Sequence, residues 1–420
     1  MKKIILKNGL RLILAPEKSG TTATVLVLVE AGSEYETKKQ NGISHFLEHL
    51  VFKGTTKRPT AAIIASELDS LGAICNAFTG QEYTGYWAKI QSGKVKNVLD
   101  IVSDLYLNPI FNAEEIDKER GVIIEEINLH EDMPMRRIQD LFTQLMYGDQ
   151  PAGWDVGGEK NIIRTLQRDD FVVYRAKHYI APATNVVIAG NFHEAEVVKM
   201  IKDTFGHLPR KKKVIKTKTK EAQKKPQLLL KHKESDQTHL VLGVRAFDTF
   251  DSRRWALQVL ANHLGGGMSS RLFQRVREEL GAAYYVRAGA DLSLDHGYLG
   301  ISAGVDHKKM DDVLKAILEE CIKLKTQPIS LADLKKTKDH LIGNFLISLD
   351  TSDEVANFYG GQEIMTGKVT EPRKVIKKIQ AVTAKEVQDV AKFIFQNKKL
   401  NMTIIGPLKD KAHLEKLLRF

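Results

Sequence analysis

Residues 42–52 read GISHFLEHLVF and contain the pattern His45-x-x-Glu48-His49. On an α-helix, residues four positions apart lie on one face, so both imidazoles can point at the same metal ion. Glu48 lies at the edge of that face and could reach a metal-bound water without binding the metal itself. Two imidazoles beside a carboxylate base make up most of a hydrolytic zinc site. We therefore expect a helix over 42–52 that carries a metal centre.

The same helix also has an ordinary interpretation. Its apolar positions form one face and consist of Ile43, Phe46, Leu47, Leu50 and Val51. Two histidines beside such a face could be boundary residues of an amphipathic helix. A catalytic zinc site needs a third protein ligand, so the pattern has to be completed elsewhere in the chain.

Residues 113–131 are the best source of that ligand. They predict a helix whose apolar stripe consists of Ile116, Ile123, Ile124 and Ile127. At about 100° per residue, Glu119 and Glu126 lie together on one flank of the stripe, whereas Glu125 lies on the solvent side. His130 lies on the same flank and competes as a ligand. Any one of these acids could also belong to a solvated helix face, so the phase leaves Glu119, Glu126 and His130 open.

The order of the expected elements predicts a duplicated α+β fold of layered sheets and helices. Residues 210–225 carry nine basic side chains and one Glu, which predicts a solvated Lys-rich linker between domains 1–209 and 226–420. In each half, an alternating strand (23–29 and 239–244) precedes a helix (42–52 and 253–264). Each half also ends on a buried strand and a closing helix. The second half, however, has no H-x-x-E-H pattern.

Composition limits the class of protein. The chain has 420 residues, of which 43% are hydrophobic and 27% charged, and its net charge is +11. No stretch approaches the roughly 18 apolar residues of a membrane span, and the first residues predict a hairpin. Cys75 and Cys321 suit neither a disulfide framework nor a Cys-based metal site, which makes a cytoplasmic protein our expectation. The basic linker lacks interleaved aromatic residues, so nucleic acid is not the expected partner.

The chain resembles the pitrilysin family of zinc peptidases, in the branch of the mitochondrial processing peptidase and its bacterial relatives. HFLEHLVFKGT at 45–55 is similar to the inverted motif of that family, and KERGVIIEEI at 118–127 is similar to its downstream helix. The resemblance implies His45, His49 and Glu126 as ligands of one Zn²⁺ per chain. It also implies that Glu119 is a supporting acid and that Glu48 is the general base on a zinc-bound water.

The resemblance extends to residues expected to contact substrate. SRLFQRVREELGAAYYV at 270–286 is similar to a family segment in which an Arg and a Tyr contact substrate. The family spacing matches Arg277 and Tyr284, with Arg275 and Tyr285 as close alternatives. Strands are expected at 73–79 and 84–90. Within the first of them, the residues similar to the family's peptide-binding edge strand are Asn76, Ala77, Phe78 and Thr79.

A zinc endopeptidase acting on short or unfolded polypeptides within a chamber is therefore the expected function. One chain carries one pair of halves, so the resemblance implies that a working chamber is a dimer. The metal motif and the Arg/Tyr pair occur on the same chain, which favours a homodimer. The alternative is a non-catalytic structural or regulatory partner of the same family. Such members usually have a degraded metal motif, whereas His45, Glu48 and His49 are all present here.

Overall fold

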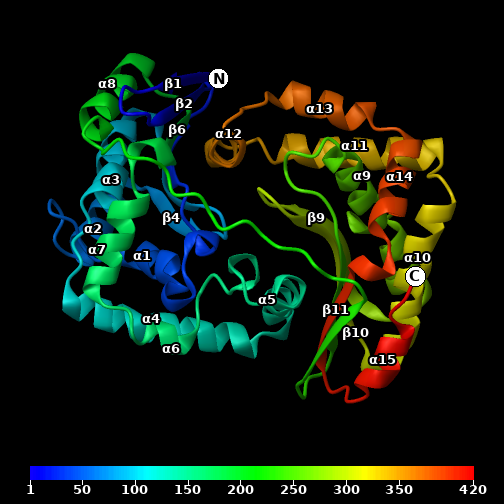
Figure 1. Ribbon diagram of the computed structural model, residues 1–420. Coiled ribbons are helices and arrows are strands. Elements are labelled where there is room, and N and C mark those ends of the chain that lie inside the picture. Colours follow the sequence, from blue (N-terminus) through cyan, green and yellow to red (C-terminus); the bar gives the residue numbers. More distant parts are fainter. The chain divides into compact units, whose positions relative to one another are not determined.

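The computed structural model describes residues 1–420, which form two compact units (Figure 1). Unit 1 comprises Met1–Asn128, Trp154–Thr217 and Leu346–Thr370, and unit 2 comprises Leu129–Gly153, Lys218–Phe345 and Glu371–Phe420. Both units therefore contain segments from both halves of the sequence. They differ from the predicted domains 1–209 and 226–420 because each half contributes one helical segment to the unit of the other.

The sheet of unit 1 has six strands in the order β1-β2-β6-β3-β5-β4. They are β1 (Lys2–Ile5), β2 (Arg11–Pro16), β3 (Thr22–Val29), β4 (Ile74–Thr79), β5 (Thr84–Gln91) and β6 (Thr184–Gly190). β2 and β6 are parallel, and the other neighbours are antiparallel. β4 is an edge strand, so one side of its backbone is not paired within the sheet.

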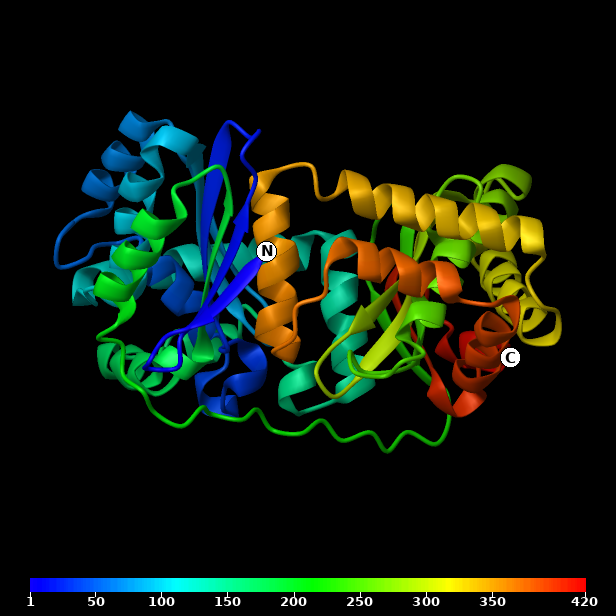
Figure 2. The same cartoon turned by 90° about the horizontal axis from the view of Figure 1, so that it is seen from above.

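Helices cover both faces of this sheet (Figures 1 and 2). The helices of unit 1 are α1 (Ile43–Val51), α2 (Ala61–Leu71), α3 (Val95–Leu107), α4 (Ala113–Asp132, which ends beyond the unit boundary), α6 (Lys160–Ile163), α7 (Arg168–His178), α8 (Glu194–Phe205) and α12 (Ser352–Thr366). Short 3₁₀ turns are η1 (Ser33–Tyr35), η2 (Lys38–Gln40), η3 (Ser92–Lys94) and η5 (Ala181–Ala183). α1, α3, α7 and α8 pack on one face, and α12 packs alone on the other.

α12 approaches its sheet closely through Gly360. A Cβ atom at Gly360 would lie 2.8 Å from Leu28 and 3.1 Å from Val187, so a larger residue would push the helix away. Ala356, Tyr359 and Ile364 complete the apolar face of α12. The sequence of α12 does not show which sheet buries these residues, and for this reason the division into 1–209 and 226–420 does not assign α12 to unit 1.

The sheet of unit 2 has five strands in the order β7-β11-β8-β10-β9. They are β7 (Gln227–His232), β8 (Thr238–Arg245), β9 (Ala283–Leu292), β10 (Gly297–Val305) and β11 (Leu400–Gly406). The helices are α5 (Pro134–Tyr147), α9 (Arg254–Gly265), the π-helical η6 (Phe273–Glu279), α10 (Met310–Thr326), α11 (Leu331–Ile347), α13 (Pro372–Ala381), α14 (Ala384–Ile394) and α15 (Lys411–Leu417). Shorter turns are η4 (Pro151–Gly153), η7 (His307–Lys309) and η8 (Asn397–Lys399).

The two units repeat one order of elements. The series β3-α1-α2-β4-β5-α3-α4 in unit 1 has its counterpart in β8-α9-η6-β9-β10-α10-α11 of unit 2. α5 packs on β8 and β11 of unit 2 as α12 packs on β3 and β6 of unit 1. The exchange is therefore reciprocal, and the equivalent helix is exchanged in each direction.

Local sequence signals agree with these elements. Thr60 caps α2, and Gly72 ends it in the left-handed conformation with φ +67°. The N-terminal hairpin is formed by β1 and β2. No helix has both the length and the apolar character needed to cross a membrane.

The Lys-rich segment 210–225 contains no helix or strand, but it is not uniformly solvated. The side chain of Lys216 is only 7% exposed and forms ion pairs with Glu34 and Glu82. Lys213 pairs with Glu30 at 2.8 Å. The expectation of a solvated linker is wrong at Lys216, because two buried carboxylates draw its ammonium group into the protein.

Candidate metal centre

The helix that carries the motif is fixed at its N-terminus by a buried carboxylate. Glu36 accepts hydrogen bonds from the backbone N–H groups of Gly42 and Ser44, both at 2.8 Å, and from Nδ2 of Asn41 at 3.0 Å. Burial raises the pKa of Glu36, and these hydrogen bonds oppose that shift. Gly42 precedes α1 with φ +94°, which a side chain would disfavour. A carboxylate at a helix N-terminus also interacts favourably with the helix dipole, so α1 starts from a defined position.

α1 and α4 bring together three side chains that could hold a metal ion. Nε2 of His45 and Nε2 of His49 are 3.3 Å apart, and Oε2 of Glu126 is 3.6 Å from each. Zinc bonds of about 2.0–2.1 Å in a tetrahedral site place donor atoms about 3.3–3.4 Å apart. Two nitrogens and one carboxylate oxygen also form a donor set typical of catalytic zinc. The three residues therefore fit a zinc ion that has one coordination position left open.

The structure also distinguishes among the acids of α4. Glu126 is half-buried and belongs to the metal-binding group, whereas Glu125 is exposed on the other side of the helix. His130, the competing candidate, is not part of the group. The helical phase read from the sequence thus agrees with the position of Glu126.

Glu119 supports one of these ligands from behind. Its Oε2 is 3.0 Å from Nδ1 of His49, and its Oε1 is 2.5 Å from Nζ of Lys53. Burial acts to raise the pKa of Glu119, but His49 and Lys53 outweigh it and the pKa is lowered. Burial acts to lower the pKa of His49. The hydrogen bond to Glu119 and the charges of the nearby carboxylates together outweigh burial, and the pKa of His49 is raised. An ionised Glu119 holds the imidazole with Nε2 turned to the metal position.

Glu48 is held from the edge strand of the sheet. Thr79 donates a hydrogen bond of 2.5 Å from Oγ1 to Oε2 of Glu48. Burial raises the pKa of the Glu48 carboxyl, and the Thr79 hydroxyl partly offsets that effect. A raised pKa suits a carboxylate that must accept and return a proton near neutral pH.

The remaining residues of the expected peptide-binding strand lie on β4. Asn76 and Ala77 are at the sheet edge, and Oδ1 of Asn76 accepts a hydrogen bond from the N–H of Ala77. Phe78 packs against Tyr83 with ring centroids 5.9 Å apart. β4 is therefore an open edge that carries Thr79 at its end, next to Glu48.

Arg277 and Tyr284 belong to unit 2, where they lie close to one another. The guanidinium of Arg277 is 4.9 Å from the ring centre of Phe273 and 6.0 Å from that of Tyr284, and Tyr284 is 74% exposed. The alternative residues are engaged elsewhere: Arg275 pairs with Glu279 at 2.7 Å, and the hydroxyl of Tyr285 is 3.1 Å from Nδ1 of His239. The two residues with the family spacing are thus the two that share an accessible surface.

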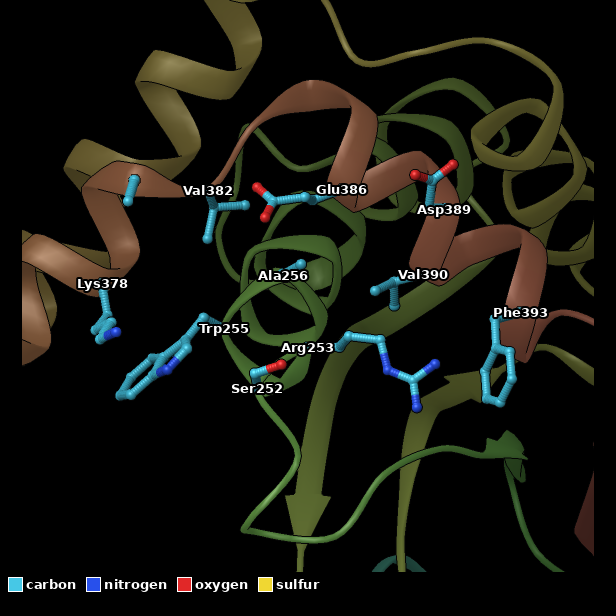
Figure 3. A pocket seen from close by; sticks show the side chains of 11 residues that line it. Ser252, Arg253, Trp255, Ala256, Lys378, Val382, Glu386, Asp389, Val390 and Phe393 are labelled. Carbon is cyan, nitrogen blue, oxygen red and sulfur yellow. The ribbon is translucent and has the colours of Figure 1, made fainter.

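A separate pocket of about 480 Å³ lies in unit 2 between the start of α9 and the α13–α14 pair (Figure 3). Trp255 and Lys378 lie toward one end of it, and Arg253 and Phe393 lie toward the other. Arg253 is already paired with Asp251 and stacks 4.6 Å from the ring centre of Phe393. The pocket is lined by no histidine or cysteine, so the metal-binding group of unit 1 is the better candidate for catalysis.

Two contacts of the centre were missed in the sequence. Lys53 lies four residues after His49, and its positive charge so near the motif was the available signal. The sequence predicts Thr79 only as a peptide-binding residue, whereas in the structure its hydroxyl contacts Glu48. Both contacts join residues far apart in the chain, so helix and strand periodicity cannot reveal them.

Known proteins resemble the chain over nearly its whole length. The family model described as Insulinase (Peptidase family M16) matches residues 11–159, and the one described as Peptidase M16 inactive domain matches 165–341. An uncharacterised zinc protease of Streptomyces coelicolor is 33% identical over 98% of this chain and 90% of its own length. One of Bacillus subtilis is 32% identical over 94% of this chain and 96% of its own.

Solved structures show the same fold. The crystal structure of a protease from Helicobacter pylori superimposes with a TM-score of 0.91 at 23% identity, over 97% of this chain and 99% of that one. A structure described as a peptidase M16 inactive domain, from Pseudomonas fluorescens, gives 0.89 at 17% identity, over 97% and 98%. These matches confirm the predicted two-part α+β fold. The relatives and the family models together establish that the chain belongs to peptidase family M16, the pitrilysin family.

Proposed function

We propose that this chain is a zinc-dependent endopeptidase that hydrolyses short or unfolded polypeptides, with one zinc ion per chain. The observation that carries the proposal is the spacing of His45, His49 and Glu126, whose donor atoms lie 3.3–3.6 Å apart. A bound zinc would supply Lewis acidity and would lower the pKa of water at the site. Its ligands in this proposal are the two imidazoles and the Glu126 carboxylate.

The chain's own residues perform the proton transfers in this proposal. Glu48 accepts the proton of the attacking water and returns it to the amine that leaves. Thr79 holds Glu48, and Glu119 fixes the orientation of His49. Arg277 and Tyr284 are proposed to contact the substrate carbonyl, since a guanidinium and a phenol are suitable donors to a developing oxyanion.

Substrate selection is proposed to depend mainly on the peptide backbone. An extended peptide can add to the open edge of β4 at Asn76, Ala77, Phe78 and Thr79, with little demand on its sequence. We propose further that the working enzyme is a cytoplasmic homodimer that encloses its substrate in a chamber. A molar mass near that of one chain, 47.2 kDa, in light scattering of the active enzyme would contradict the dimer.

The test combines metal analysis with peptide digestion. Purified protein is expected to contain one zinc per chain and to cleave unfolded polypeptides at internal bonds, and a chelator should abolish cleavage until zinc is restored. Glu48→Gln should retain zinc and lose cleavage. A chain that binds no zinc, or a Glu48→Gln variant with full activity, would favour the alternative of a non-catalytic partner within the family.

A further inference from the structure

The side chain of Thr79, at the end of β4, points to the face of the sheet that α1 covers. Successive side chains of a strand point to opposite faces of the sheet. Cys75 and Ala77 pack into the core on the α1 side, whereas Phe78 packs on the α12 side. Thr79 belongs to the first series, and its hydroxyl therefore points at α1, where it meets Glu48.

Glu48 depends on this hydroxyl. The Thr79 hydroxyl provides the one hydrogen bond that the Glu48 carboxylate receives in the structure. Without that donor the carboxylate would have no fixed direction, and a misplaced general base loses much of its effect.

Thr79 is also the last residue of the edge strand. On one side it pairs with Thr84 of β5, and on the other side β4 has no neighbour in the sheet. A peptide that adds to β4 would order the backbone of this strand up to its end. The residue that holds the proposed base therefore belongs to the strand that would receive the peptide.

We propose that Thr79 is a positioning residue that couples peptide docking on β4 to the orientation of Glu48. This inference rests on the proposed function. The hydroxyl acts on the base and not on the peptide, so its loss should reduce the rate of the chemical step and leave substrate affinity unchanged. If the hydroxyl only stabilised the strand, its loss would lower stability, and if it only contacted the peptide, its loss would raise KM.

The test compares Thr79→Val with Thr79→Ser. Valine keeps the shape and the strand preference but removes the hydroxyl, whereas serine keeps the hydroxyl. We expect Thr79→Val to bind one zinc, to keep KM within about twofold and to lose about 10- to 100-fold in kcat, a part of the roughly 100- to 10,000-fold that a general base contributes. Thr79→Ser should recover kcat to within about threefold.

A matched control is Thr84→Val on the neighbouring strand. The hydroxyl of Thr84 is also buried and hydrogen-bonded, but it donates to the backbone carbonyl of Ala31 at 2.8 Å. This variant is expected to lose stability and to keep the kcat of its folded fraction. A fall in kcat equal to that of Thr79→Val would mean that any lost hydroxyl in this sheet has the same effect, and it would overturn the inference.

A crystallographic readout separates this inference from the proposed function. Crystal structures of the wild type and of Thr79→Val should show the Glu48 carboxylate in one position in the former and in several in the latter, whether or not the protein cleaves peptides. Lack of zinc-dependent cleavage by the wild type would refute the proposed function alone. An unchanged Glu48 in Thr79→Val, or a serine variant as slow as the valine variant, would refute the role of Thr79.

Discussion

Nζ of Lys53 lies 2.5 Å from Oε1 of Glu119, in the helix opposite the His45–His49 pair. The second oxygen of the same carboxylate is 3.0 Å from Nδ1 of His49. One carboxylate therefore connects Lys53 to His49, a proposed metal ligand. Because Lys53 helps to lower the pKa of Glu119, it keeps that acid ionised and able to accept the hydrogen bond of the imidazole.

Lys53→Met is expected to weaken zinc binding about 10-fold, the lower end of the range for outer-shell partners of a metal site. The unbranched apolar side chain of methionine fills most of the space of the lysine stem but leaves Glu119 without its cation. Competition between the apoprotein and a chelator of known affinity measures the change. Lys57→Met is the control, since Lys57 pairs with Asp100 and is 57% exposed. Equal zinc affinities of the two variants would show that the Lys53–Glu119 pair does not support the metal site.

Glu126→Gln is expected to lower zinc affinity about 100-fold or more, exceeding the effect of an outer-shell change. An amide oxygen carries no charge and is a weaker zinc ligand than a carboxylate. Glu125→Gln removes the same charge from the preceding residue, on the exposed side of α4, and should leave zinc content unchanged. Zinc content after dialysis, measured by mass spectrometry, compares them. If the Glu125 variant lost zinc and the Glu126 variant kept it, the ligand would be Glu125 and the prediction for Glu126 would be wrong.

Periodicity placed His45 and His49 on one face of α1 and narrowed the third candidate ligand on α4 to Glu119, Glu126 or His130, and the family resemblance then selected Glu126. Ile116 and Ile123 are buried, and that fixes the rotation of α4 and turns Glu126 toward α1. Periodicity could not predict which sheet would bury α5 or α12, since an apolar stripe identifies a buried face but not its partner. It also missed the burial of Lys216, which depends on Glu34 and Glu82 from a distant part of the chain.

Tyr284→Phe is expected to reduce kcat/KM by about 100-fold, the lower end of the range for the loss of one donor to a developing oxyanion. Tyr284 is exposed beside Arg277, whereas Tyr285 is hydrogen-bonded to His239. Tyr285→Phe should therefore leave kcat/KM within about threefold and lower stability by about 1 kcal/mol. Steady-state cleavage of a fluorogenic peptide and urea unfolding separate these effects. The reverse order of activities would select Tyr285 as the substrate-contacting residue.

The stability of unit 1 is expected to fall in mild acid because of His178. Burial lowers its pKa to about 4, and Nδ1 has no hydrogen-bond partner. The unfolded chain binds a proton near pH 6.5, whereas the folded chain resists it until about pH 4, so stability decreases as pH falls between these values. The full contribution is on the order of 3 kcal/mol. His178→Gln removes this titration and should flatten the loss of unfolding free energy between pH 6.5 and 4.5.

The control for this measurement is His207→Gln, at an exposed position of the same unit. Both variants are unfolded with urea at a series of pH values, so a lower stability of either variant at pH 7 does not affect the slope. His263, whose pKa is also lowered to about 4 by burial, lies in unit 2 and retains its own share of the pH dependence. An unchanged slope in His178→Gln would mean that the folded protein protonates His178 as readily as the unfolded chain does, and that the ring becomes solvated without unfolding of the unit.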